Sequence, residues 1–234
     1  MSLEPLLYNP PREPRLIVIH EDRDMVVLNK PSGLLSVPGR TPDLFDSALS
    51  RVRETHPNAQ AVHRLDLGTS GVLVVATRRK AEAVLRQQFQ DRLTRKAYLA
   101  RVRGVLSEDS GQVDLPLVCD WPNRPRQMVC HATGKPALTE YTVLERRLDS
   151  TLVLLRPHTG RSHQLRVHLA SLGHPILGDN LYGEQAPGQR LHLHASQLGL
   201  RHPFSGEWMV FHAPCGFAPH VTPFHLDPPA DVQG

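Results

Sequence analysis

The sequence predicts an α+β fold, with a mixed, mostly antiparallel central sheet and a few flanking helices. Short apolar runs, some alternating with polar residues, recur between turn-forming residues, as in strands joined by hairpins. Two longer segments repeat their apolar residues at the 3.6-residue period of a helix. With 234 residues, the chain can bury a core without disulfides or metals.

The first half of the chain is expected to form two pairs of strands and two helices. The strands are predicted over 16–19 and 25–28, around a turn at 21–24, and over 61–64 and 72–77. The helices are predicted over 46–55, ended by Pro57, and over 79–92. In the second helix one face carries the apolar residues and is expected to cover the sheet: Ala81, Val84, Leu85 and Phe89.

The second half is expected to be richer in strands. They are predicted over 96–105, 113–117, 138–144 and 151–155, with a turn at 148–150 joining the last two. A helix is predicted over 162–172, with the Ser162 hydroxyl as its N-cap and Gly173 at its end. Leu165, Leu169 and Leu172 would then face inward.

The chain divides into an irregular leader (1–15), a main domain (16–215) and a proline-rich extended tail (216–234). Its three cysteines are an odd number spread widely, which favours a reducing compartment over a secreted disulfide framework. No signal peptide or membrane span is apparent. We therefore expect a cytoplasmic protein without membrane contact, and a monomer, since no heptad pattern demands a dimer.

The charge pattern favours a polyanionic partner. The net charge is +4, and basic residues cluster at 51–53, 78–80, 92–96, 101–103 and 124–126. Such clusters suit the phosphates of a nucleic acid, although basic residues also solvate ordinary helix faces. Aromatic residues make up only 5%, which argues against a broad stacking platform for single strands. Recognition of shape and phosphates is expected instead.

Two polar segments are candidates for chemistry. The first, His63-Arg64-Leu65-Asp66, is followed by a glycine-rich turn and the apolar run 72–75, so that a carboxylate lies beside a cation and an imidazole at a strand edge. Taken alone, it is also compatible with an ordinary aspartate turn. The second lies around the start of the last predicted helix, where two arginines oppose the helix dipole and so imply a negative partner. It contains Arg161, His163, Gln164 and Arg166.

Neither a metal nor a cofactor is expected. His163 and His168 are five residues apart, which does not place them on one helix face as a zinc-binding pair requires. His192 and His194 share a strand face, but no nearby thiol or carboxylate completes a ligand set. The glycine-rich signatures of phosphate loops and dinucleotide-binding folds are absent.

Five motifs occur in an order and spacing that resemble the RluA-type pseudouridine synthases. They are Asn29-Lys30-Pro31-Ser32-Gly33, His63 to Gly71, Lys96-Ala97-Tyr98, Arg161 to Arg166, and His174 to Asp179. The resemblance covers about 16–215; Ser162 replaces a threonine common among relatives and keeps the hydroxyl. It implies the pseudouridine synthase fold, with a mixed sheet around an RNA-binding cleft. It also implies isomerisation of uridine to pseudouridine in structured RNA, without a cofactor.

The resemblance also implies roles for particular residues. Asp66 would be the catalytic carboxylate, and both attack on C1′ and removal of the C2′ proton remain open to it. Tyr98 would pack on the uracil and assist removal of the C5 proton, while Arg166 would pair with Asp66 and keep it ionised. Arg64 would fill the space of the flipped nucleotide. Further RNA contacts are expected from His63, Lys30, Arg161, His163 and Gln164.

By the same resemblance, the substrates are a tRNA anticodon stem-loop, a large-subunit rRNA hairpin, or both. The target positions implied are uridine 32 of tRNA and uridine 746 of 23S rRNA. Only residues 1–15 precede the first predicted strand, as in the subgroup that lacks an N-terminal S4-type domain. Two other functions remain open: another base-acting RNA enzyme, such as a glycosidase that releases uracil, and a catalytically silent RNA-binding protein. The joint presence of Asp66, Tyr98 and Arg166 weighs against silence.

Overall fold

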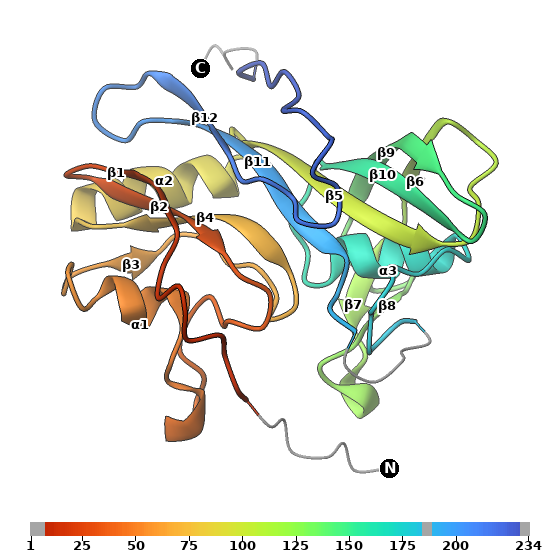
Figure 1. Ribbon diagram of the computed structural model, residues 1–234, viewed down its shortest axis with the longest axis horizontal. Helices are drawn as coiled ribbons and strands as arrows, with labels where there is room; N and C mark the ends of the chain where they lie inside the picture. The colour runs from red at the N-terminus through yellow and green to blue at the C-terminus, as the bar shows by residue number, and fades with distance from the viewer. Residues whose placement is uncertain (1–7, 184–188, 230–234) are drawn as a thin grey trace.

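One long sheet runs through the whole protein and is flanked by helices on both halves (Figure 1). The computed structural model describes residues 8–183 and 189–229. The ten strands of this sheet include a path in the order β1-β2-β4-β11-β5-β10-β9-β6, with β12 paired to β11 and β3 paired to β4. Every pairing is antiparallel except that of β11 with β4. The predicted α+β class and mostly antiparallel sheet are confirmed.

The strands are β1 Val18–Glu21, β2 Met25–Lys30, β3 Gln60–Ala61, β4 Ser70–Ala76, β5 Arg95–Arg103, β6 Ser110–Asp114, β7 Leu117–Cys119, β8 Gln127–Val129, β9 Leu138–Arg146, β10 Ser150–Pro157, β11 Leu193–Arg201 and β12 Trp208–His212. The helices are α1 Ala48–Val52, α2 Arg79–Gln90 and α3 Gln164–Ser171, with 3-10 turns at Pro42–Leu44 and Trp121–Asn123. Strands β7 and β8 form a separate hairpin. Strands β7, β8, β11 and β12 had not been predicted as elements, and the strand predicted over 113–117 spans the end of β6 and the turn before β7.

Helix α2 forms where expected, but its buried face differs from the prediction. Ala81 and Leu85 are buried as predicted, whereas Val84 is 42% exposed and Gln88 is buried in its place. A buried glutamine is tolerated because both ends of its amide are satisfied. Its Nε2 donates to the carbonyl of Arg201 and its Oε1 accepts from the Arg201 amide, each at 2.8 Å.

The start of α3 also departs from the prediction. The helix begins at Gln164, and its N-cap is His163, not Ser162. His163 adopts a left-handed backbone (φ 54°) and makes no side-chain cap. The expected cap is replaced by the buried Gln164 side chain, whose Oε1 accepts from the Arg161 amide and the Thr159 hydroxyl. The turn before α3 is thereby fixed by the side chain of the first residue of the helix.

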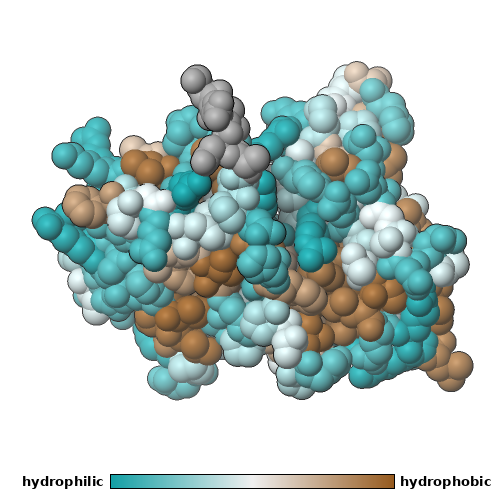
Figure 2. All heavy atoms as spheres, turned by 90° about the horizontal axis from the view of Figure 1, so that it is seen from above, coloured by the Kyte–Doolittle hydropathy of each residue, from teal (hydrophilic) through white to brown (hydrophobic). Residues whose placement is uncertain are grey.

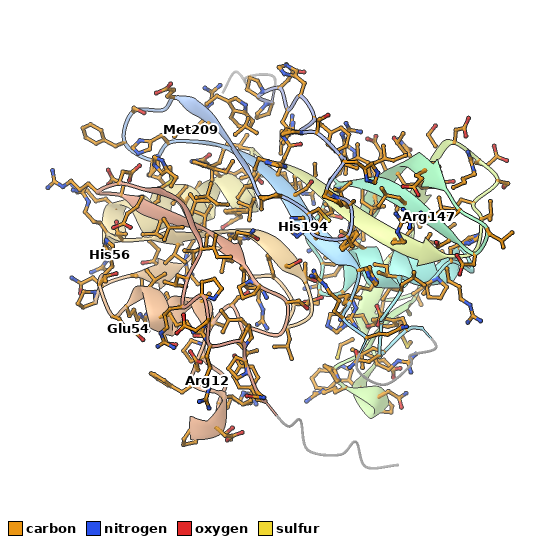
Figure 3. All side chains as sticks on the ribbon, in the orientation of Figure 1. Arg12, Glu54, His56, Arg147, His194 and Met209 are labelled. Atoms are coloured by element: carbon orange, nitrogen blue, oxygen red, sulfur yellow. The ribbon has the colours of Figure 1, made fainter. Side chains whose placement is uncertain are left out.

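Strands β4 and β11 hold the two halves of the sheet together near its middle, where His194 lies (Figure 3). The buried His194 ring accepts from the Ser70 hydroxyl (2.9 Å) and donates to the Ala213 carbonyl (3.0 Å). Burial lowers the pKa of His194 to about 4, so the ring is neutral at physiological pH. One imidazole thus joins β4, β11 and the segment after β12.

The C-terminal segment is extended and packed over 216–229; the rest of the predicted tail, 230–234, lies outside the described residues. Over 216–229 it has no helix or strand, yet Ala218 and Leu226 are buried in one apolar cluster with β5 and β10 residues. The Gln197 side chain pairs with both backbone groups of Phe224 (2.7 and 2.8 Å), and the Trp208 indole donates to the Leu226 carbonyl. Figure 2, which views the protein from above, shows mostly hydrophilic side chains with apolar patches between them.

In the part of the chain that the structure describes, no helix combines the length and apolar composition needed to cross a membrane.

Gly71 tests the close approach of β4 and β11. Its φ is +112°, and a Cβ there would lie 2.1 Å from the Ala195 carbonyl oxygen. Gly173 has a similar φ of +81° but open space around its Cβ position. We expect Gly71→Ala to lower the free energy of unfolding by about 3 kcal/mol or more, and Gly173→Ala by only about 1 kcal/mol. Urea unfolding measures both; equal losses would contradict the close packing.

Candidate active site

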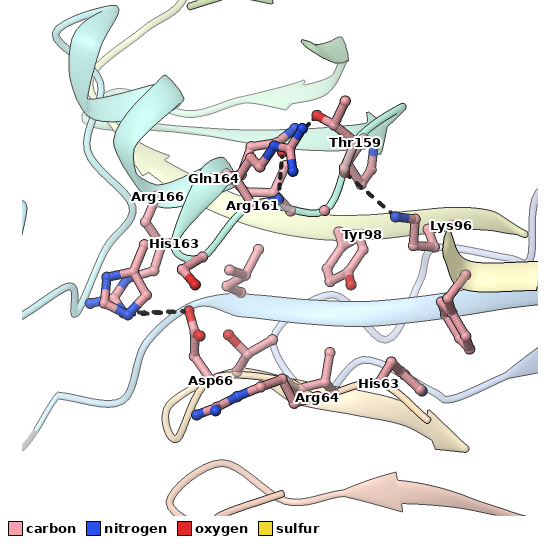
Figure 4. A pocket seen from close by; sticks show the side chains of 18 of the residues that line it. His63, Arg64, Asp66, Lys96, Tyr98, Thr159, Arg161, His163, Gln164 and Arg166 are labelled. Atoms are coloured by element: carbon pink, nitrogen blue, oxygen red, sulfur yellow. Dashed lines mark hydrogen bonds and ion pairs between the residues drawn. The ribbon is translucent and has the colours of Figure 1, made fainter. Parts of the chain in front are cut away.

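A cleft of about 540 Å³ lies between the two halves of the protein (Figure 4). Its walls are the turn at 63–69, the end of α2 with the start of β5, the segment 157–166 that leads into α3, and Leu193 of β11. The sheet therefore brings together three of the predicted motifs that are far apart in sequence. Asp66, Tyr98 and Arg166 all line this one cleft.

Asp66 is placed between two basic side chains. Its carboxylate is 27% exposed, and its Oδ2 lies 3.6 Å from Arg166 Nη1 and 3.9 Å from His163 Nε2. The predicted proximity of Arg166 and Asp66 is therefore present. Both distances exceed that of a good hydrogen bond, so the oxygens of Asp66 stay available to another partner.

The strongest bonds of Arg166 go to Asp179. Nε and Nη2 of Arg166 each donate to one Asp179 oxygen at 2.7 Å, and the Asp179 side chain is fully buried. Burial alone would raise the pKa of Asp179, but the hydrogen bonds and charge of Arg166 hold it below its usual value. Asp179 had been noted only as the end of a motif; its place beside a helix arginine could not be read from sequence spacing.

His163 is oriented by Tyr182, a second residue that the sequence analysis missed. The Tyr182 hydroxyl accepts from the Gln127 amide (2.7 Å) and lies 2.7 Å from His163 Nδ1. The hydroxyl is placed to donate to Nδ1, and in that tautomer the ring proton lies on Nε2, the nitrogen that faces Asp66. Burial lowers the pKa of His163, so a neutral N–H points at the carboxylate.

Tyr98 lies on β5 and faces into the cleft between Asp66 and Lys96 (Figure 4). Burial and the charge of Asp66 raise the pKa of Tyr98, because both disfavour a phenolate. The ring also packs against the apolar clusters of both halves. Tyr98 is thus a fixed, neutral phenol on the wall of the cleft.

The segment that follows β2 clamps the Asp66 loop. Ser36 Oγ donates to the Leu65 carbonyl (2.7 Å) and accepts from the Leu65 amide (3.0 Å). Ser32 Oγ donates to the Gly68 carbonyl (2.7 Å), and the Gly33 amide donates to the carbonyl of Leu67. The loop is held on both sides of Asp66. Holding this loop accounts for the position of the Asn29–Gly33 motif next to it.

Lys30 belongs to the same clamp, which argues against its predicted phosphate contact. The side chain is only 1% exposed, and Nζ donates to the carbonyls of Pro31, Leu34 and Leu67 at 2.7–3.3 Å. Burial lowers the pKa of Lys30 to about 7, although the charge of Asp66 opposes this shift. The Lys30 amine ties loop carbonyls together, and its contact with a phosphate stays a prediction.

Gln164 and His63 are also used within the protein. Gln164 is 4% exposed, and its Nε2 donates to the Leu138 carbonyl and the Thr139 hydroxyl, which argues against its predicted RNA contact. His63 accepts from the Val74 amide (2.9 Å) and stacks on Phe89, and burial lowers its pKa to about 3. His63 lines the cleft as a neutral ring and cannot hold a phosphate by charge.

Arg64 and Arg161 remain accessible to a ligand. Arg64 is exposed and lies beside Asp66 at the edge of the cleft (Figure 4). Arg161 is half-buried in the cleft wall and donates from Nε to the Pro136 carbonyl (3.1 Å), which leaves its other donors for the cleft. Their predicted contacts with RNA stay predictions.

A possible metal-ligand group occurs away from the cleft. Within the described residues, the one group of three His, Cys, Asp or Glu ligand atoms close enough to share an ion is Asp22, Asp24 and His202. Asp24 already pairs with Arg78 at 2.9 Å, and Asp22 accepts from two backbone amides of its own turn. These contacts account for the carboxylates without an ion.

Comparison with known proteins identifies the family. Residues 24–171 match the family described as RNA pseudouridylate synthase. The chain belongs to this family. Similar proteins include the dual-specificity RNA pseudouridine synthase RluA of Escherichia coli O6:H1, which is 55% identical over 90% of this chain and 98% of its own length. RluA of Pasteurella multocida is 52% identical over the same shares.

Solved structures agree with the family assignment. Human RNA pseudouridylate synthase domain containing 1 is 32% identical and superposes with a TM-score of 0.72 over 88% of this chain and 85% of that chain. Human RNA pseudouridylate synthase domain containing 4 is 28% identical and superposes with a TM-score of 0.70 over 87% of this chain and 90% of that chain. The predicted pseudouridine synthase fold is confirmed, and this synthase is an isomerase that forms pseudouridine in RNA.

The buried role of Lys30 predicts a pH dependence of stability. Between pH 7 and about 10 the unfolded chain keeps a proton on Lys30 that the folded protein has released, so stability rises with pH in this window. Lys30→Met removes this contribution. We expect the difference in free energy of unfolding between wild type and Lys30→Met to increase from pH 7 to 10, measured by urea unfolding; a constant difference would contradict the burial.

RNA binding by the same variant separates the two roles of Lys30. A lysine on a phosphate contributes about one unit to the slope of log affinity against log salt concentration. Because Nζ is enclosed, Lys30→Met is expected to leave this slope unchanged. If the slope fell by about one unit in Lys30→Met, Lys30 would contact a phosphate after all.

Proposed function

We propose that this pseudouridine synthase acts on hairpin-loop uridines of both tRNA and large-subunit rRNA, with Asp66 as its catalytic carboxylate. The observation that carries the catalytic assignment is the position of Asp66: a partly exposed carboxylate at the cleft wall, flanked by Arg166 and a neutral His163. The dual substrate class is supported by the relatives named dual-specificity synthases, which this chain matches over nearly their full length.

The reaction needs only groups that the cleft supplies. The N1–C1′ bond of uridine breaks, the uracil rotates while bound, a C5–C1′ bond forms, and the proton on C5 is lost as N1 gains one. Nothing is oxidised or reduced overall, so acid–base and nucleophilic groups suffice. Asp66 can open the glycosidic bond either by attack on C1′ or by removal of the C2′ proton, since both atoms lie on the sugar that it would face.

Tyr98 and Arg166 would support this carboxylate in different ways. The Tyr98 ring would pack on the uracil. Its raised pKa keeps the hydroxyl protonated, so the hydroxyl can accept the C5 proton only while it passes its own proton on. Arg166 supplies positive charge beside Asp66 when the phosphates of the substrate arrive. Arg161 and His163 would contact the RNA near the same end of the cleft.

Arg64 is proposed to replace the flipped nucleotide in the RNA stack. A base inside a folded loop cannot reach Asp66 at the cleft wall unless it leaves its neighbours. Arg64 is exposed and lies next to Asp66, so its planar guanidinium can enter the space that is vacated.

We also propose that the enzyme works as a monomer in the cytoplasm. Its three cysteines are all free, which fits a reducing compartment. The Asp66 cleft is built from residues of a single chain.

Asp66 is tested by release of tritium from C5 of uridine in tRNA and rRNA transcripts. Wild type is expected to release tritium without added metal or nucleotide, and Asp66→Asn to reduce release roughly a thousandfold or more, because the isosteric amide neither attacks C1′ nor takes a proton. Asp149→Asn, in an exposed turn at the far end of β10, serves as the matched control. Undiminished release by Asp66→Asn would overturn the assignment.

Arg64 is tested by comparing two substrates. Arg64→Ala is expected to lower conversion of a folded hairpin about tenfold, since stacking of a planar group on a base contributes roughly 1–3 kcal/mol. On a short oligonucleotide whose target base is already unstacked, the loss should largely disappear. An equal loss on both substrates would contradict the stacking role.

A further inference from the structure

A second groove continues from the catalytic cleft on the side away from Asp66. It encloses about 570 Å³ and shares Arg92, Lys96, Pro157 and His158 with the cleft. Its other walls are the start of β5, the end of β10 and the C-terminal segment at 225–227. No part of the chemistry described above uses this groove.

The groove gathers cations that lack anionic partners. Among the described residues, none of its four basic side chains forms an ion pair with a carboxylate: Arg92, Arg95, Lys96 and Arg156. Elsewhere the arginines are commonly paired, as in Arg51–Asp46, Arg78–Asp24, Arg101–Glu145, Arg146–Asp109 and Arg166–Asp179. Unpaired cations along a concave surface attract an anionic ligand.

Lys96 stands at the junction of cleft and groove. It lies on the other side of Tyr98 from Asp66, and among the described residues its side chain makes one long polar contact, from Nζ to the Thr159 carbonyl at 3.5 Å (Figure 4). Burial and the charge of Arg92 lower the pKa of Lys96 to about 8, because nothing anionic compensates them. A phosphate at this position would supply that compensation.

Arg92 occupies a backbone position that favours glycine. It follows α2 with φ 60°, and the Leu93 amide closes the helix end by donating to the Gln88 carbonyl at 2.9 Å. Glycine is the usual residue at such a helix end, since a side chain there is strained. The exposed Arg92 side chain thus stands at a strained backbone position beside the three other cations of the groove.

The acidic and aromatic neighbours do not neutralise the groove. Asp227 is its one carboxylate, and it bonds to His225 at 2.7 Å. Glu140 lies beside the groove residue His158 at 3.0 Å. Arg156 has the Phe224 ring 6.0 Å away as its aromatic neighbour. The four cations therefore exceed the single groove carboxylate.

We propose that the RNA strand on one side of the target uridine leaves the cleft past Lys96 and runs along this groove, with its phosphates held by Arg92, Arg95 and Arg156. This inference rests on the proposed function, because it extends the path of the same substrate. RNA is favoured over another polyanion since the groove opens directly into the cleft that takes the uridine. The C-terminal segment forms the outer wall of the path.

Arg92→Gly provides a test that misfolding cannot mimic. Removing the strained side chain should leave the melting temperature unchanged or raise it. RNA affinity should fall about three- to tenfold at low salt, and the slope of log affinity against log salt should fall by about one unit. The double variant Arg95→Ala/Arg156→Ala should lose about two units. Arg147→Ala removes an exposed arginine that pairs with Glu145 at the opposite end of β10 from the groove; it is the control and should change neither the affinity nor the slope.

Truncated substrates locate the strand. Hairpins that lack the nucleotides either 5′ or 3′ of the target loop are bound by wild type and by Arg92→Gly. One of the two truncations is expected to abolish the difference between the proteins, because it removes the phosphates that the groove holds. An unchanged salt slope, or a difference that persists with both truncations, would overturn the groove. Failure of wild type to convert uridine in the intact hairpins would instead overturn the proposed function.

Discussion

The active site depends on keeping a carboxylate accessible beside a polyanionic substrate. The buried pair of Arg166 and Asp179 achieves this, because Asp179 takes two of the guanidinium nitrogens and leaves one for Asp66. A guanidinium without this partner would be able to close onto Asp66 as a bidentate pair and occupy both of its oxygens. Held as it is, Arg166 supplies charge without covering the reacting group. The neutral His163, fixed by Tyr182, adds an N–H without a second full charge.

The surroundings of this pair are rigid for identifiable reasons. The Asp66 loop is bound by the Lys30 amine and by Ser32 and Ser36 on either side of the carboxylate. Strand β11 joins β4 in parallel and β5 in antiparallel fashion, and so fixes the distance between the Asp66 loop and the Tyr98 strand. Lys30 and Gln164, which were expected to contact RNA, form hydrogen bonds within the protein instead. Some basic and polar side chains of the motifs therefore serve to position Asp66 through bonds within the protein.

Charge is distributed differently inside the protein and along its RNA-facing surfaces. Several arginines that hold structural elements together pair with carboxylates, as Arg51, Arg78 and Arg101 do, whereas within the described residues no ion pair with a carboxylate is formed by the arginines of the groove. The unpaired group begins at Arg64 next to Asp66 and continues through Lys96 to Arg156. A path of this kind binds the backbone of a folded RNA through phosphates and shape, and leaves selection of the uridine to the enclosed cleft.

The sequence by itself determined the α+β class, most elements of the sheet and the motifs that meet in the cleft. Local periodicity and the order of motifs are properties of the chain that can be read without its fold. Asp66, Tyr98 and Arg166 could be named for that reason. Only the tertiary structure decided which neighbouring side chains face the cleft and which face the interior. Lys30 and Gln164 carry the same donors whether buried or exposed, and their burial is set by the packing of distant segments. Asp179 is likewise assigned by its contact with Arg166, which no spacing along the chain encodes.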